Sequence, residues 1–221
     1  MKLLVSLIAI FLLTITANSQ VSLALFAGPQ ATTAIYSANS VKQSTKYKFG
    51  FQAGALLKVP FENRLSFTPA LYYSMKGYKV AFTQFVYPPD ITAKDNDTRI
   101  HTLETAFLLQ YDFSSDKESA GSVKNHCFIR LGPSLDFQLF GHENYNTMPA
   151  GSVSRSMPYG FDKYGHYSAN AIIQFGFESG KGMMIYAHYS YGLANINNAD
   201  DGPKIRHQAF GVSFGKYLHH K

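Results

Sequence analysis

The sequence has one cysteine, little charge and, beyond its first twenty residues, no long apolar run. Cys127 cannot form an internal disulfide, so a secreted fold would depend on strand pairing and packing alone. No stretch after Gln20 approaches the roughly 20 apolar residues that a helix needs to cross a bilayer, which excludes a helical membrane protein. The net charge of +6 is spread along the chain without a dense Lys/Arg cluster, so it does not indicate nucleic-acid binding.

The first residues have the three regions of a secretory signal peptide. Lys2 supplies the charge, residues 3–15 the apolar stretch, and Ala17 and Ser19 the small side chains that a signal peptidase accepts. We expect cleavage after Ser19, so that residues 1–19 are the signal peptide and residues 20–221 form one domain. The protein should therefore be exported.

Most of the remaining chain alternates between apolar and polar or small residues, which is typical of strands with one greasy face. Residues 46–61 show this best, and the turn at residues 62–64 leads into a second strand of the same kind. Apolar side chains occupy the alternate positions Tyr47, Phe49, Phe51, Ala53, Ala55, Leu57, Val59 and Phe61. The pattern predicts a β-hairpin with an apolar outer face.

Eight such segments are each long enough to cross a membrane when tilted, for which about 9 to 11 residues suffice. They lie near residues 21–29, 46–61, 65–78, 100–113, 126–140, 166–178, 183–193 and 205–218. Short links near 62–64, 114–125 and 179–182 alternate with longer ones near 30–45, 79–99, 141–165 and 196–204. This alternation predicts an all-β fold, an eight-stranded antiparallel up-and-down transmembrane β-barrel with both termini in the periplasm.

Aromatic residues on the predicted outer face gather toward the strand ends, as in the aromatic belts of membrane proteins. Those expected near the long loops are Tyr47, Tyr73, Tyr167, Tyr189 and Tyr191, and those expected near the short turns are Phe61, Phe113, Phe177 and Tyr217.

Several motifs resemble the PorT-like family of outer-membrane β-barrel domains, and the likeness covers nearly all of the chain after residue 19. Residues 49–54 read FGFQAG, residues 63–67 NRLSF and residues 69–77 PALYYSMKG, which is similar to a hairpin of that family. Further similar stretches are Leu103-Glu104, the RLGP of residues 130–133 and the YSYGLANI of residues 189–196. The resemblance implies an outer-membrane location in a Gram-negative bacterium, and a few members of the family are linked to secretion machinery.

Eight charged residues are predicted to point into the barrel. An eight-stranded barrel is just wide enough for side chains to fill it, so these groups must pair or remain hydrated. We expect a plug of ion pairs centred on Glu104 and Arg130 that closes the pore, against the alternative that water solvates each charge separately. The predicted network comprises Lys48, Lys58, Lys76, Glu104, Asp112, Arg130, Asp136 and Glu178.

No arrangement in the sequence indicates catalysis or a bound metal. His188 with Ser190, and His166 with Ser168, share a strand face, but residues two apart on a strand are about 7 Å apart and do not form a dyad. Oxygen-bearing residues between 195 and 201 lack the spacing of a Ca²⁺ loop. The tyrosines of the long segments, Tyr87, Tyr145, Tyr159 and Tyr164, fit either a recognition surface or packing over the barrel mouth.

We therefore expect an integral outer-membrane barrel with a structural, binding or envelope-assembly role, without catalysis and without cofactors. Its expected partners are outer-membrane lipid, lipopolysaccharide and other envelope proteins. The alternatives are a small-solute channel and a soluble, secreted, lipocalin-like ligand carrier, whose barrel would point its apolar residues inward.

Overall fold

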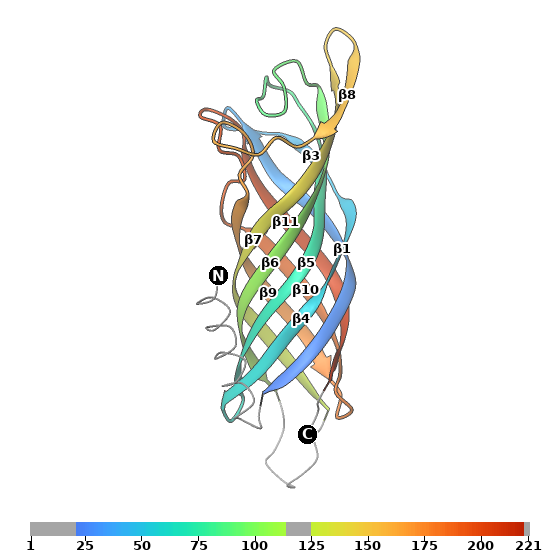
Figure 1. Cartoon of the computed structure of the whole chain (residues 1–221), viewed down its shortest axis with the longest axis vertical. Coiled ribbons are helices and arrows are strands. Elements are labelled where there is room, and N and C mark those ends of the chain that lie inside the picture. Colours follow the sequence, from blue (N-terminus) through green and yellow to red (C-terminus); the bar gives the residue numbers. More distant parts are fainter. Residues whose placement is uncertain (1–20, 114–124, 219–221) are drawn as a thin grey trace, which may run out of the picture.

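The computed structural model describes residues 21–113 and 125–218, which form one tall, closed β-barrel (Figure 1). The predicted signal peptide and residues 114–124 of one predicted link lie outside the described residues. No helix in the described part of the chain is long and apolar enough to span a membrane.

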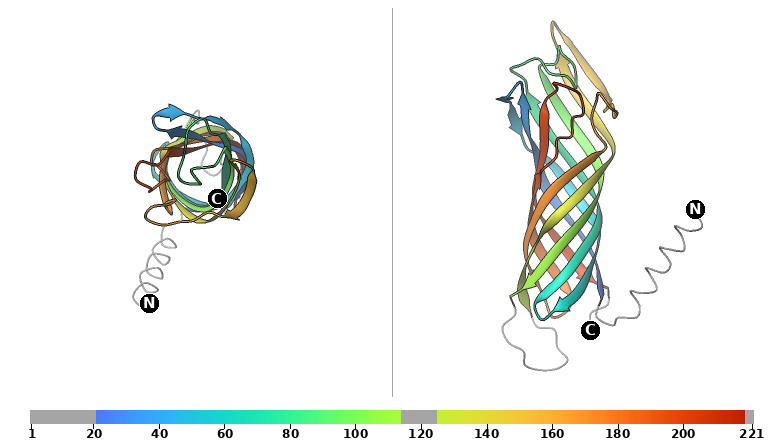
Figure 2. Two further views of the ribbon diagram at one scale, coloured as in Figure 1. Left: turned by 90° about the horizontal axis from the view of Figure 1, so that it is seen from above. Right: turned by 90° about the vertical axis from the view of Figure 1, so that its left-hand side faces the viewer.

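Eight strands close the barrel wall in chain order, each antiparallel to its neighbours: β1 (Ser22–Ala38), β4 (Lys48–Glu62), β5 (Leu65–Ala81), β6 (Asp95–Asp112), β7 (His126–Thr147), β9 (Tyr167–Glu178), β10 (Met183–Gly192) and β11 (Lys204–Tyr217). Pairing of β1 with β11 completes the ring, which is seen end-on in Figure 2. Three short strands pair with single wall strands: β2 (Val41–Lys42), β3 (Ser44–Lys46) and β8 (Gly151–Ser156). The predicted eight-stranded up-and-down barrel is thus confirmed.

Side chains on the outer face of the wall are apolar and exposed, as the alternation predicts. Phe49 is 74% exposed, Phe214 60% and Leu135 57%. A protein surrounded by water rarely exposes a continuous apolar surface of this kind, whereas lipid requires it. The soluble lipocalin-like alternative, which needs the opposite arrangement, does not fit.

The strands are longer at the long-loop end than the sequence predicts. β1 continues through Pro29 to Ala38, and β7 continues past Phe140 to Thr147, where it pairs with β8. Proline has no amide hydrogen to donate, and the register of β1 with β11 skips Gly28 and Pro29 while the register with β4 runs through them. A proline was therefore accommodated within a wall strand where we had predicted its end.

A β-bulge changes which face of β7 points inward. His101 pairs with Phe140 and Thr102 with Gln138, so Leu139 is an extra residue, and both Leu139 and Phe140 are exposed. Beyond the bulge the odd-numbered residues face the lumen, including Glu143 and Tyr145.

The aromatic residues predicted to lie outside do so with one exception. Tyr217 was predicted to belong to the outer belt at the short turns, but it is only 3% exposed and lies in the lumen. It shares the parity of Ser213 on β11, which is buried, and not that of Phe214, which is exposed. The prediction was wrong because it ignored the alternation of its own strand.

Candidate functional site

The lumen is filled by side chains arranged in polar and apolar groups. Two apolar clusters occupy it, one around Phe26, Tyr72, Phe128 and Tyr186, and one at the long-loop end around Tyr36, Tyr78 and Tyr164. Polar side chains lie between and below these clusters, and most of them are hydrogen-bonded, as buried polar groups require.

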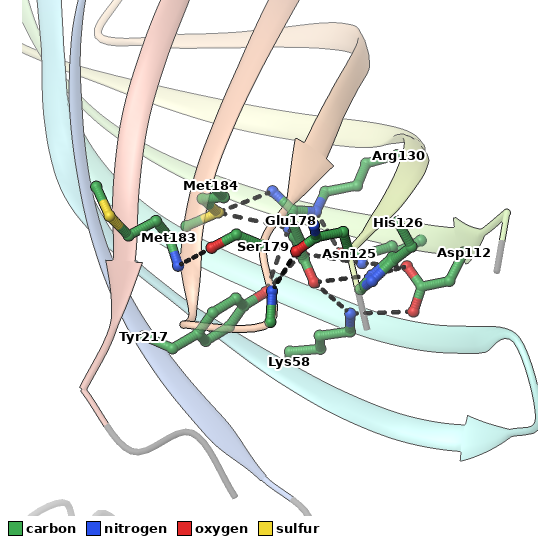
Figure 3. A network of polar contacts seen from close by, with 12 residues as sticks. Lys58, Asp112, Asn125, His126, Arg130, Glu178, Ser179, Met183, Met184 and Tyr217 are labelled. Carbon is green, nitrogen blue, oxygen red and sulfur yellow. Dashed lines mark hydrogen bonds and ion pairs between the residues drawn. The ribbon is translucent and has the colours of Figure 1, made fainter. Parts of the chain in front are cut away.

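The largest polar group lies at the short-turn end, where five wall strands that contribute to it begin or end (Figure 3). We call it the turn-end cluster; its members are Lys58, Gln110, Asp112, His126, Arg130, Glu178 and Tyr217. Lys58 Nζ lies 3.0 Å from Asp112 Oδ2 and 2.8 Å from Glu178 Oε2, so one ammonium joins the two carboxylates. Lys58 and Arg130 thus balance the charges of the Asp112 and Glu178 carboxylates.

Glu178 is the centre of the turn-end cluster. Its Oε1 accepts hydrogen bonds from Arg130 Nη2 at 2.9 Å and from the Tyr217 hydroxyl at 2.8 Å. Arg130 is fully buried, and its guanidinium also lies 4.1 Å from the centroid of the Phe128 ring. A buried arginine held by a carboxylate and stacked on an aromatic ring is a typical way to stabilise this charge away from water.

Three members of the turn-end cluster could, by residue type, hold a metal ion. One ligand atom each from Asp112, His126 and Glu178 lies within 4.8 Å of the others. However, the Lys58 ammonium already lies within hydrogen-bonding distance of both carboxylates. Lys58 supplies the positive charge that a metal would bring, so the geometry favours an internal ion-pair network over a metal centre.

A second charged group, the mid-lumen cluster, consists of Lys76, Glu104 and Asp136. Lys76 Nζ lies 2.9 Å from Glu104 Oε2 and 2.7 Å from Asp136 Oδ2, and all three side chains are almost completely buried. Ser134 donates to Glu104 and accepts from Asn170 at 3.1 Å. Glu104 therefore pairs with Lys76, and Arg130 with Glu178, so the two residues on which we centred the predicted plug belong to two separate clusters.

Lys48 is not part of either cluster. Its ammonium pairs with Asp97, on the outer side of the wall, where Lys79 also contacts Asp97 at 3.0 Å. The chain is irregular at Tyr47, between β3 and β4, so the alternation that predicted an inward Lys48 does not hold there. The Lys48 side chain can pass over Gly77, which has no side chain; a Cβ at that position would lie 3.4 Å from Cδ of Lys48.

The histidines considered as catalytic bases have other partners. His188 is buried and lies 3.4 Å from the Gln52 amide nitrogen and 3.3 Å from the Gln30 amide oxygen. His166 Nδ1 lies 2.9 Å from the carbonyl oxygen of Gln138. Asn195, one of the polar residues weighed as a calcium ligand, instead accepts a hydrogen bond from the Ile205 amide at 2.7 Å.

The mouth of the barrel contains a polar residue that the sequence analysis missed. Glu143 is fully buried and accepts from Arg155 Nε at 2.7 Å and from the Tyr164 hydroxyl at 3.0 Å. Arg155 also donates to the carbonyl oxygen of Pro89 at 2.8 Å, which ties β8 to the loop between β5 and β6. The only sequence signal was the pair of apolar residues at the β7 bulge, which shifts Glu143 into the lumen.

Electrostatics stabilise these contacts of Glu143 at the mouth. Burial works against the charged form of Arg155, but the adjacent Glu143 carboxylate more than offsets it and raises the pKa of Arg155. Burial raises the pKa of Tyr164 well above its usual value. Both groups thus keep the protonated form that donates hydrogen bonds to Glu143.

Residues 16–198 match the family described as outer membrane protein beta-barrel domain. Among solved structures, Ail of Yersinia pestis, in complex with the heparin analogue sucrose octasulfate, is 14% identical, with a TM-score of 0.41 and coverage of 89% of this chain and 99% of that one. Neisserial surface protein A is 12% identical, with a TM-score of 0.47 and coverage of 89% and 97%. OprG of Pseudomonas aeruginosa is 10% identical, with a TM-score of 0.45 and coverage of 90% and 96%.

Comparison with curated protein sequences gave no match. The family match covers well over half of the chain, and the closed barrel with an apolar outer face agrees with it. The protein therefore belongs to the outer membrane protein beta-barrel domain family and is located in the outer membrane.

Proposed function

We propose that this protein is a non-conducting outer-membrane barrel that binds a partner through its extracellular loops and carries out no catalysis. The observation that carries the proposal is the filled lumen. Arg130, Phe128 and Tyr186 are buried near the short-turn end, and Tyr36 and Tyr164 are buried at the mouth. A solute would have to displace packed rings and paired charges at two levels, which argues against the channel alternative.

The loops offer a surface that the lumen does not. Large apolar side chains stand exposed at the long-loop end, above the wall: Phe161 is 84% exposed, Phe85 76% and Ile91 63%. Tyr87 is about half exposed, whereas Tyr145 and Tyr164 are buried. Of the two interpretations of the loop tyrosines, packing therefore suits Tyr145 and Tyr164, and recognition suits Tyr87 together with the exposed apolar residues.

Three finer assignments belong to this proposal. The likeness of residues 49–77 to the PorT-like hairpin supports a role within a larger envelope assembly. The N-terminal sequence supports a signal peptide cleaved after Ser19, which mass spectrometry of the protein isolated from outer membranes would test. Burial of His188 beneath the loops supports the absence of catalysis, because a lipid or peptide substrate has no access to it.

Conductance of the purified, refolded barrel in planar bilayers tests the closed lumen directly. We expect no discrete current steps. We expect steps to appear when side chains at both levels are replaced by alanine, Arg130 and Tyr186 near the short turns together with Tyr36 and Tyr164 at the mouth, and this variant would serve as the control for insertion. Discrete steps from the unaltered protein would refute the proposal.

The binding role needs a second test. A photo-crosslinking amino acid at position 161 should yield protein adducts in intact cells, whereas the same group at the lipid-facing position 135 should not. Equal adducts at both positions would show that the loops are not a specific binding surface.

A further inference from the structure

The outer face of the wall carries two adjoining hollows above the apolar belt. One, of about 440 Å³, is lined by residues of β4, β6, β7 and β8 that include Arg99, His142 and Ser156. The other, of about 390 Å³, includes Lys46 and Lys79. Asp97 and Asn144 line both hollows, so they form one continuous surface, which we call the collar patch.

The strand register explains why these residues meet. Lys46 pairs with Lys79 across β3 and β5, Lys79 with Asp97 across β5 and β6, and Asp97 with Asn144 across β6 and β7. One step nearer the belt, Arg99 pairs with His142. Paired residues on one face of a sheet lie about 5 Å apart, so the basic groups converge from four strands.

The charge of the collar patch is only partly neutralised. Asp97 is shared by Lys48 and Lys79, and Asp95 accepts hydrogen bonds from Asn146 at 2.9 and 2.8 Å. In the described part of the chain, neither Lys46 nor Arg99 has an acidic residue within ion-pairing distance, and both are exposed. The patch therefore keeps a positive charge beside polar side chains able to bind sugar hydroxyls.

The position of the collar patch along the barrel axis indicates which part of the membrane it contacts. Directly below it, the exposed face carries a ladder of neighbouring rings: Tyr73 lies 5.9 Å from His101, and His101 stacks on Phe140 at 4.3 Å, measured between ring centroids. Aromatic side chains of this kind lie at the boundary between lipid tails and headgroups. The basic groups two and four residues above the ladder thus lie at headgroup level.

We propose that the collar patch is a binding site for the phosphorylated sugar headgroup of a glycolipid in the outer leaflet. Arg99 with His142, and Lys46 with Lys79, form two corners for anionic groups, and Asn144 and Ser156 contact the sugar between them. Arginine and lysine together suit phosphate, because arginine binds two oxygens at once and lysine supplies a compact charge. The inference depends on the outer-membrane location and not on the proposed binding role of the loops.

The test uses the purified, full-length barrel in detergent micelles and fluorescently labelled lipopolysaccharide, whose binding is followed by anisotropy. The variant Lys46→Gln/Arg99→Gln removes the two unpaired charges. The matched control, Lys204→Gln/Arg206→Gln, removes two exposed charges from β11, outside both hollows. A heat-dependent gel shift confirms that each variant is folded. The single variant His142→Gln provides a second measurement of lipopolysaccharide binding at the patch.

We expect about 25-fold weaker binding for the patch variant, since each of its two basic groups contributes about fivefold near the lipid surface. The control, whose charges lie outside the site, should lose less than about twofold. Dephosphorylated lipopolysaccharide should compete about tenfold less well than the intact glycolipid. Equal losses in the two double variants would show general charge attraction and overturn the site. Full competition by inorganic phosphate at low millimolar concentration would assign the patch to free phosphate and overturn the glycolipid assignment.

Discussion

Replacing Glu178 should destabilise the barrel more than replacing Arg130, although the two residues form one ion pair. Among the described residues, Glu178 is the only acidic partner of Arg130, whose side chain is completely buried. The variant Glu178→Gln therefore leaves a buried guanidinium without a counter-charge. Losing one partner of a buried pair typically costs about 3 to 5 kcal/mol of unfolding free energy, and we expect a loss in that range.

Replacing Arg130 instead should cost less, because the remaining Glu178 carboxylate keeps other partners. In Arg130→Met, Glu178 keeps Lys58 at 2.8 Å and the Tyr217 hydroxyl, and the methionine can pack against the Phe128 ring that the guanidinium now covers. Replacing a buried charge by an apolar side chain of similar volume is often nearly neutral, so we expect a loss below about 2 kcal/mol. The double variant should lose clearly less than the sum of the two single losses.

Urea unfolding in phospholipid vesicles, followed by the gel shift of the folded band, measures these differences. The exposed pair Lys79–Asp97 provides the control: its side chains are 54% and 34% exposed, and Lys79→Met should cost less than about 1 kcal/mol. Additive losses in the double variant, or a larger loss for Arg130→Met than for Glu178→Gln, would refute the conclusion that Glu178 is the centre of the turn-end cluster.

Three further outcomes follow from the structure. Gly28→Val should prevent closure of the barrel, because a Cβ at that position lies 2.0 Å from a backbone carbonyl oxygen of β11; the folded band on a gel should be lost. The hydrogen bonds that Thr92 donates to Asp90 lower the pKa of that carboxyl, so they stabilise the loop above this pKa and are lost as pH falls through it. The protection of the Thr92 amide, measured as its hydrogen-exchange rate relative to that of an unfolded peptide at the same pH, should fall there, and constant protection would contradict this. If the short turns face the periplasm, Cys127, which is exposed near them, should not react with a membrane-impermeant maleimide in intact cells, whereas a cysteine introduced at Ser152 on β8 should react. Labelling of Cys127 alone would show that the barrel has the opposite orientation.

Period-two alternation was sufficient to predict the wall, because lipid imposes one rule on every outward position. It was reliable in β6 and β9, where buried and less buried positions alternate along nearly the whole strand. It failed where a local feature changed the parity or the end of a strand. The extra residue Leu139 moved Glu143 inward, and the irregularity at Tyr47 moved Lys48 outward.

The partners within the lumen depend on information that alternation does not contain. Lys58 on β4 meets Glu178 on β9, and these residues are 120 positions apart on strands that do not pair with each other. Which inward side chains face one another across a barrel depends on the tilt and stagger of its strands, and these are set by the register summed around the whole ring. One bulge anywhere in the wall changes that sum. Inward charge could therefore be predicted from the sequence, whereas the division into a turn-end cluster and a mid-lumen cluster required the closed structure.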